Sequence, residues 1–200
     1  MRRRVFSHLA GIRQRNSFSA FCLSIAGTVG YRLPSLDINP QTREEGRCSL
    51  AADALRSWGV VKLRARGVSM LPSLWPGDLL TVQSRRPEQV EPGELVLYMR
   101  HRRFFVHRVV SKRLAGNEVV LVARGDCMPQ DDPPVQSGEV LGKITEIQRA
   151  GLSFLPVGKL SRFRRIVAYM LCRWSLFRRV GLRLWELCHR RYSETQRALA

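Results

Sequence analysis

The sequence predicts a mainly β protein, a coiled antiparallel β-sheet or barrel followed by a basic α-helical extension. Between residues 60 and 148, short apolar or alternating runs recur at the length of a strand. Turn sequences separate several of these runs, at Pro76-Gly77-Asp78, Pro92-Gly93 and Ala115-Gly116-Asn117. Beyond residue 157 the apolar spacing becomes helical instead. Regular short strands with such breaks favour antiparallel pairing.

Six strands are expected in this region. They are Val60–Arg66, Leu79–Gln83, Leu95–Arg100, Phe104–Lys112, Glu118–Arg124 and Glu139–Gln148. A short helix, Ser49–Trp58, should precede the first strand, with Ser49 as its N-cap. The polar, turn-rich stretch Pro34–Gly46 before that helix is interpreted as a linker.

The chain divides into three predicted segments. Residues 1–47 form a basic, weakly ordered arm, residues 48–150 the β domain, and residues 151–200 a basic amphipathic helical extension. The arm contains a mildly apolar run, Phe18–Tyr31, that is shorter than the roughly twenty residues needed to span a bilayer. A basic start followed by an apolar run has the shape of a signal sequence. The run is therefore either a signal or anchor, or part of a poorly ordered arm.

The net charge of +18 is concentrated at the two ends of the chain. Residues 1–47 carry eight basic and three acidic side chains, and residues 157–200 carry eleven and two. Basic arms attract anionic lipid and nucleic acid alike. No base-reading motif accompanies the charge, so we expect an anionic membrane surface rather than nucleic acid as a partner.

The C-terminal extension has the pattern of a basic amphipathic helix. Within residues 158–191, apolar side chains recur at 163, 166, 167, 170, 171 and 174, and arginines occupy much of the remaining surface. Two interpretations stay open: a helix packed on the β domain with a solvated basic face, or a helix lying on an anionic membrane. The second predicts a peripheral or weakly anchored membrane protein, and whether a partner protein supplies an anchor stays open.

Cysteine and glycine patterns point to no cofactor and no metal. The five cysteines form no Cys-x-x-Cys pair and no metal-ligand spacing with the four histidines, so reduced thiols are expected. Cys127 lies beside an acidic loop and is interpreted as a partly buried spectator. No glycine-rich phosphate loop is present.

Three segments of the middle region carry residue types suited to acyl-transfer chemistry. Ser69 lies in a bend between two predicted strands, where a serine can reach a substrate or serve as an ordinary turn residue. His107 lies within an apolar, β-branched run. Asp126, Asp131 and Asp132 lie in a loop rich in Gly and Pro. An imidazole can remove the proton of a serine hydroxyl near neutral pH, and a carboxylate can orient that imidazole.

Five boxes carry a family resemblance. They are Gly-x-Ser-Met-x-Pro-x-Leu-x-x-Gly-Asp from residue 67, Gly-Glu-Leu-Val-Leu-Tyr from 93, Val-His-Arg-Val-Val from 106, Gly-Asp-x-x-x-x-Asp-Asp from 125 and Val-Leu-Gly-Lys-Ile from 140. In this order the boxes resemble a type I signal peptidase of the signal peptidase and self-cleaving repressor superfamily. The nearest branch, from archaea, the endoplasmic reticulum and sporulating bacteria, uses histidine where the main bacterial branch uses lysine.

The resemblance implies roles for four residues. Ser69 matches the nucleophile, His107 the general base and Asp132 the triad carboxylate, while Asp126 matches a supporting carboxylate. Gly67 departs from the usual serine, so an oxyanion hole would rest on backbone N–H groups. The Gly-x-Ser-Met form is closer to the self-cleaving repressors, although those need a lysine base.

The function expected from these observations is a serine endopeptidase that cleaves exported or membrane-proximal polypeptides. Two alternatives stay open. One is a self-processing regulator that cuts its own N-terminal arm, where Ala26-Gly27 offers a small-residue bond about forty residues before Ser69. The other is a non-catalytic module that kept the fold and binds membrane or nucleic acid through its basic arms.

Overall fold

A computed structural model describes residues 24–25, 40–173 and 179–185 of the chain. Its strands are β1 (Ser24–Ile25), β2 (Val60–Arg64), β3 (Leu79–Ser84), β4 (Leu95–Arg100), β5 (Arg103–Ala115), β6 (Glu118–Arg124), β7 (Val140–Arg149) and β8 (Leu152–Phe154). Its helices are α1 (Pro40–Trp58) and α2 (Arg162–Arg173), with short 3-10 turns at Pro87–Gln89 and Ser137–Glu139. Residues 179–185 are also helical.

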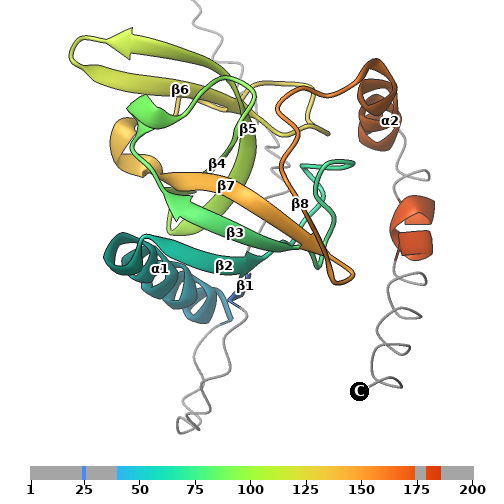
Figure 1. Ribbon diagram of the computed structural model, residues 1–200, viewed down its shortest axis with the longest axis horizontal. Coiled ribbons are helices and arrows are strands. Elements are labelled where there is room, and N and C mark those ends of the chain that lie inside the picture. Colours follow the sequence, from blue (N-terminus) through green and yellow to red (C-terminus); the bar gives the residue numbers. More distant parts are fainter. Residues whose placement is uncertain (1–23, 26–39, 174–178, 186–200) are drawn as a thin grey trace, which may run out of the picture.

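The strands form one antiparallel sheet in the order β1-β2-β3-β7-β4-β5-β6, with β8 paired to β7. The sheet is strongly coiled (Figure 1). It does not close, because within the described part of the chain no ladder joins β6 back to β1 or β2. The mainly β, antiparallel fold expected from the sequence is therefore confirmed, as an open coiled sheet.

Strand β4, between β7 and β5 in the sheet, separates two apolar cores. Leu95 and Leu97 belong to the larger core, beneath α1, whereas Val96 and Tyr98 belong to the second core, against β6. Successive side chains of a strand point to opposite faces. Burial on both faces explains why β4 is a continuous apolar run rather than an alternating one.

Helix α1 is longer than the sequence suggested. The helix ends at Trp58 as expected, but the expected start with an N-cap at Ser49 is wrong, because the helix begins at Pro40 and Ser49 lies in its interior. Proline suits the first turn of a helix, where its missing N–H has no intrahelical acceptor. Residues 40–46 of the segment interpreted as a linker therefore supply the first turns of α1, and residues 34–39 lie outside the described residues. Gly46 and the surrounding polar residues hid this start.

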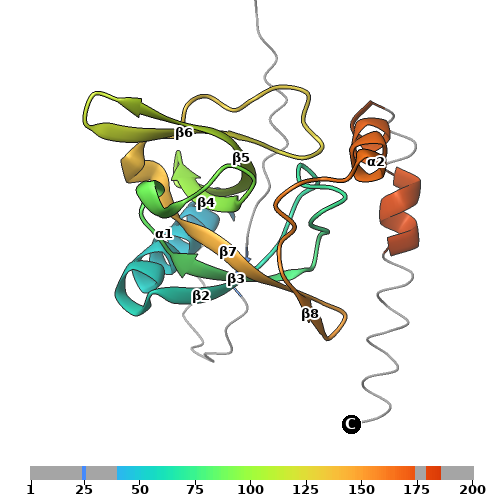
Figure 2. The same cartoon turned by 45° about the horizontal axis from the view of Figure 1, so that its top comes forward.

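The C-terminal extension packs against the β domain through two aromatic and apolar contacts. Leu171 of α2 clusters with Leu71 and Cys127. Trp185, in the second helical stretch, stacks on Trp75 with ring centroids 4.8 Å apart. Figure 2 shows both helical pieces on the side of the domain away from α1. The helical pattern predicted over residues 158–191 begins as helix α2 at Arg162, and residues 174–178 and 186–191 lie outside the described residues.

No helix among the described residues is long and apolar enough to cross a membrane. Most of the Phe18–Tyr31 run lies outside the described residues, apart from the two-residue strand β1.

Candidate active site

Ser69 lies in a tight turn that follows β2. The Leu71 N–H donates to the Val68 carbonyl at 3.3 Å, and the Leu74 N–H to the Met70 carbonyl at 2.9 Å. Met70, Leu71 and Leu74 are completely buried and hold this turn against the cores. Ser69 itself is only 2% exposed. The buried apolar residues after Ser69 therefore fix its position.

The loop after β6 closes on the Ser69 turn. The Cys127 N–H donates to the Ser69 carbonyl at 2.8 Å. Gly125 approaches so closely that a Cβ there would lie 2.7 Å from the Ser69 carbonyl oxygen and 3.2 Å from the Ser69 Cβ. Only a residue without a side chain fits this approach. The glycine of the Gly-Asp box is thus needed for contact with the serine.

His107 faces Ser69 from β5. It pairs with Val96 of β4 and lies on the face shared by Phe105 and Val109. Its Nε2 atom lies 3.1 Å from the Ser69 Oγ atom, which is hydrogen-bond distance. The His107 side chain is only 6% exposed. The strand predicted around His107 therefore positions the imidazole within hydrogen-bond distance of the serine hydroxyl.

Asp132 binds the other side of the imidazole. Its Oδ2 atom contacts His107 Nδ1 in a short polar contact, and its side chain is 8% exposed. The Asp132 N–H donates to the Ala123 carbonyl of β6 at 2.8 Å, which fixes the backbone behind the carboxylate. With a carboxylate on Nδ1, the imidazole is oriented so that Nε2 can accept the serine proton.

Tyr98, on β4, is a further member of this cluster. Its hydroxyl donates to Asp132 Oδ2 at 2.9 Å and lies 3.4 Å from His107 Nδ1. Burial, reinforced by the negative charge of Asp132, raises the pKa of the Tyr98 phenol well above its ordinary range. The phenol therefore stays protonated and remains a hydrogen-bond donor to Asp132.

Arg100 fixes the loop that follows Asp132. Its guanidinium donates to the carbonyls of Pro133 at 3.2 Å and Pro134 at 2.8 Å, and it forms two hydrogen bonds to Glu139. The hydrogen bond from Arg100 lowers the pKa of Glu139, and the same bond raises the pKa of Arg100. Both groups therefore stay charged near neutral pH, and the clamp persists.

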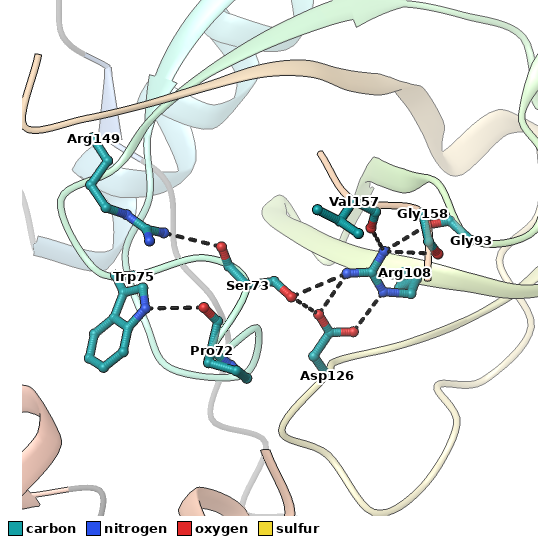
Figure 3. A network of polar contacts seen from close by, with 9 residues as sticks. All are labelled: Pro72, Ser73, Trp75, Gly93, Arg108, Asp126, Arg149, Val157 and Gly158. Atoms are coloured by element: carbon teal, nitrogen blue, oxygen red, sulfur yellow. Dashed lines mark hydrogen bonds and ion pairs between the residues drawn. The ribbon is translucent and has the colours of Figure 1, made fainter. Parts of the chain in front are cut away.

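Asp126 is held in a separate network, apart from the imidazole. Its carboxylate accepts two hydrogen bonds from Arg108, each 2.8 Å long, and a short one from the Ser73 hydroxyl. Arg108 also donates to the carbonyls of Gly93, Val157 and Gly158 (Figure 3). One guanidinium thus joins β5, the serine turn, the Gly-Asp loop and the C-terminal connection.

The third candidate carboxylate is at the surface. Asp131 pairs with Arg124 at 3.4 Å, and both side chains are nearly half exposed. The structure therefore brings Ser69, His107 and Asp132 into one chain of contacts. Asp126 is not part of this chain of contacts, because it pairs with Arg108. Asp131 is exposed to solvent.

Sequence reasoning missed the residues that support this cluster. Tyr98 ends the Gly-Glu-Leu-Val-Leu-Tyr box, and Arg108 directly follows His107, so both lay within motifs already singled out. Arg149, at the end of β7, was also missed; it bonds the buried Asp78 carboxylate and the Ser73 carbonyl. Its partners are more than seventy residues away in sequence, so no local pattern could identify them.

The residue types and contacts of this cluster suit proton transfer and acyl transfer. Among the residues that the structure describes, no three His, Cys, Asp or Glu side chains are arranged to hold a metal ion. The contacts among Ser69, His107 and Asp132 follow the order of the relay that activates a hydroxyl in serine hydrolases. Cys127 and Cys172 lie in the apolar contact with α2.

A comparison with known protein families finds a family that matches this chain. The family described as Peptidase S24-like matches residues 24–145, which is more than half of the 200-residue chain. The chain belongs to this family, which covers signal-peptidase-like proteins and self-cleaving repressors and is a serine peptidase family. No curated protein matches the chain. The superfamily inferred from the five boxes is thereby confirmed.

Proposed function

We propose that this member of the Peptidase S24-like family is a serine endopeptidase in which Ser69 is the nucleophile and His107 the general base. The single observation that carries the proposal is the 3.1 Å contact between Ser69 Oγ and His107 Nε2, with Asp132 on the opposite ring nitrogen. A serine hydroxyl is a weak nucleophile until such a base takes its proton.

In the proposed reaction, His107 Nε2 removes the Ser69 proton as Oγ attacks the carbonyl carbon of the scissile peptide bond. The imidazolium then donates that proton to the leaving amine, which leaves an acyl-enzyme. Water, deprotonated by His107, hydrolyses the acyl group. Asp132 stabilises the imidazolium, and the Tyr98 hydroxyl holds the Asp132 carboxylate in place.

The oxyanion of the tetrahedral intermediate would be stabilised by backbone groups. Gly67 offers no side chain, and within the described residues the Ser69 N–H donates to no backbone carbonyl. That N–H can therefore donate to a developing oxyanion. This supports the expectation that backbone donors replace the side chain found in some relatives.

We further propose that the substrates are exported or membrane-proximal polypeptides cut after small residues. The support is the set of five boxes that resembles the Ser-His signal peptidase branch. His107 occupies the position of the base in that branch, and it is the base within contact of Ser69.

The test uses purified full-length chain and labelled peptides that contain small residues before the cleaved bond. Ser69→Ala and His107→Ala should each abolish cleavage, and the double variant should lose little more, because the two side chains act as one unit. Ser84→Ala, a serine at the end of β3, is the matched control and should cleave normally. Full cleavage by Ser69→Ala would refute the proposal.

One observation favours a second candidate function, self-processing. Strand β1 pairs antiparallel with β2, with Ser24 opposite Arg64 and Ile25 opposite Leu63. The chain's own N-terminal segment thus adds a strand beside the segment that leads into Ser69. Strand addition is a common mode of peptide recognition. The adjoining bond Ala26-Gly27 lies outside the described residues.

Mass spectrometry of the purified protein separates the three functions. Self-processing yields a shortened chain whose new N-terminus lies in residues 1–47, and Ser69→Ala stays intact. An endopeptidase acting on other chains cleaves the added peptides. A non-catalytic module does neither, and its binding to any partner is unchanged by Ser69→Ala.

A further inference from the structure

A basic cavity lies between α2 and the loop that carries Asp126 and Cys127. Its volume is about 650 Å³. Lys159, Arg165 and Arg173 line it from the C-terminal extension, and Arg108 and Arg124 from the β domain. None of the proton-transfer residues Ser69, His107 and Asp132 lines it. The cavity is therefore a feature separate from the proposed catalytic relay.

The charge inside the cavity is not balanced by the protein. Asp126 is the one carboxylate that lines it, and Asp126 is already occupied by Arg108 and Ser73. Arg124 pairs with Asp131. Among the described residues, Lys159, Arg165 and Arg173 take part in no ion pair. Three uncompensated cations around one cavity favour an anionic ligand.

Large apolar side chains are exposed beside this cavity. Phe163, Ile166 and Tyr169 of α2 are 74%, 57% and 67% exposed, while Ala168 and Leu171 form the face buried on the domain. Leu155, just before α2, is 76% exposed. Across residues 150–185 the sequence has eight basic side chains and no acidic one. Exposed apolar side chains among basic ones are typical of a helix that lies in the interface of a membrane.

We propose that this cavity binds the phosphate group of an anionic phospholipid, with the exposed face of α2 resting in the bilayer surface. Lys159, Arg165 and Arg173 would contact the headgroup, and Phe163 and Ile166 would enter the acyl boundary. Nucleic acid would satisfy the cations equally well, but it offers no apolar phase for Ile166 and Leu155. The exposed aliphatic side chains therefore favour lipid.

The proposed lipid site lies one loop away from the nucleophile. Cys127 lines the cavity and its N–H bonds the Ser69 carbonyl, so the loop that borders the bound headgroup also supports the serine. The proposal would place the Ser69 cluster near a bilayer. Lipid binding itself does not depend on peptidase activity, so the test below remains informative if the proposed function fails.

Sedimentation of the full-length chain with vesicles tests the proposal. Wild type should bind vesicles of equal parts phosphatidylglycerol and phosphatidylcholine, and should bind pure phosphatidylcholine weakly. Replacing Lys159, Arg165 and Arg173 together by Gln should weaken binding about a hundredfold, at about fivefold per basic residue near an anionic surface. Added salt should weaken wild-type binding in the same direction.

The matched control removes the same charge elsewhere. Arg43, Arg47 and Arg113 are exposed and form no ion pair among the described residues, and α1, which carries the first two, lies far from α2 (Figure 1). Replacing these three by Gln should leave most of the binding intact. An equal loss in both triple variants would mean that total charge, not this cavity, attracts the vesicles, and would overturn the proposal.

A second variant separates lipid from other phosphate ligands. Phe163→Ser with Ile166→Ser keeps every charge and should still weaken vesicle binding at least tenfold. Unchanged vesicle binding in this variant would overturn the proposal. So would soluble glycerophosphate or duplex DNA that binds the wild type tightly and displaces it from vesicles. Circular dichroism and amide exchange of α2 establish that each variant is folded.

Discussion

Neutralising the two buried carboxylates near Ser69 should have different effects: the Asp132 variant should lose activity, and the Asp126 variant should lose stability. Asp132→Asn removes the charge that orients His107, but an asparagine oxygen can still accept the Tyr98 hydrogen bond. We expect catalysis to fall by about ten-thousand-fold, the size of effect seen when a triad carboxylate is replaced by its amide. The loss of a hydrogen bond to a charged group should cost only about 1.5 kcal/mol of unfolding free energy.

Asp126→Asn should instead destabilise the fold. The Asp126 side chain is 3% exposed and forms two hydrogen bonds with Arg108, and breaking a buried ion pair from one side costs about 3–5 kcal/mol. Arg108 keeps the carbonyls of Gly93, Val157 and Gly158, so we expect the lower end, about 3 kcal/mol. For a chain of this length that corresponds to a fall in Tm of roughly 6–12 °C.

Calorimetry and a labelled-peptide assay on the same preparations measure both effects. Asp131→Asn is the control, because Asp131 forms an exposed ion pair that should be worth less than about 1 kcal/mol. If Asp126→Asn abolished turnover at unchanged Tm while Asp132→Asn stayed active, the assignment of the two carboxylates would be wrong. Equal loss of Tm in both variants would refute the claim that Asp126 stabilises the fold more than Asp132 does.

Three further predictions follow from the packing and the titrating groups. The raised pKa of Tyr98 means that the folded state keeps a proton that the unfolded state releases near pH 10. The free energy of unfolding should therefore fall by about 1.4 kcal/mol for each pH unit above about 10. Denaturant titrations should show this slope in wild type and not in Tyr98→Phe. The lowered pKa of Glu139 makes the free energy of unfolding depend on pH in acid. The stabilising contact of Glu139 with Arg100 is present above about pH 4.5 and is lost as pH falls below it. The free energy of unfolding of Glu139→Gln should therefore depend less on pH in acid. Leu171→Ala should cost about 2–4 kcal/mol at the contact of α2 with the domain, and amide exchange should show α2 released before the sheet; equal protection of α2 in both proteins would contradict this contact.

The sequence alone determined the strand pattern and the candidate reactive residues. Leu95–Arg100 and Glu118–Arg124 were predicted with the bounds that the structure has, because short apolar runs and flanking turn residues are local signals. Ser69, His107 and the aspartates were identified because each lies in a short motif with unusual chemistry. The start of α1 was mispredicted because its first turns are polar and contain Gly46, which are signals of a linker.

Only the tertiary structure shows which histidine or arginine side chain each aspartate contacts. Asp126, Asp131 and Asp132 lie within seven positions of one another, and only the family resemblance ranked Asp132 first; in the structure they contact Arg108, Arg124 and His107 respectively. Those partners come from other strands, and the coil of the sheet sets the distances between them. The same reason hid Tyr98 and Arg149. Sequence patterns report periodicity along one segment, whereas a site is made by contacts between segments that are far apart in the chain.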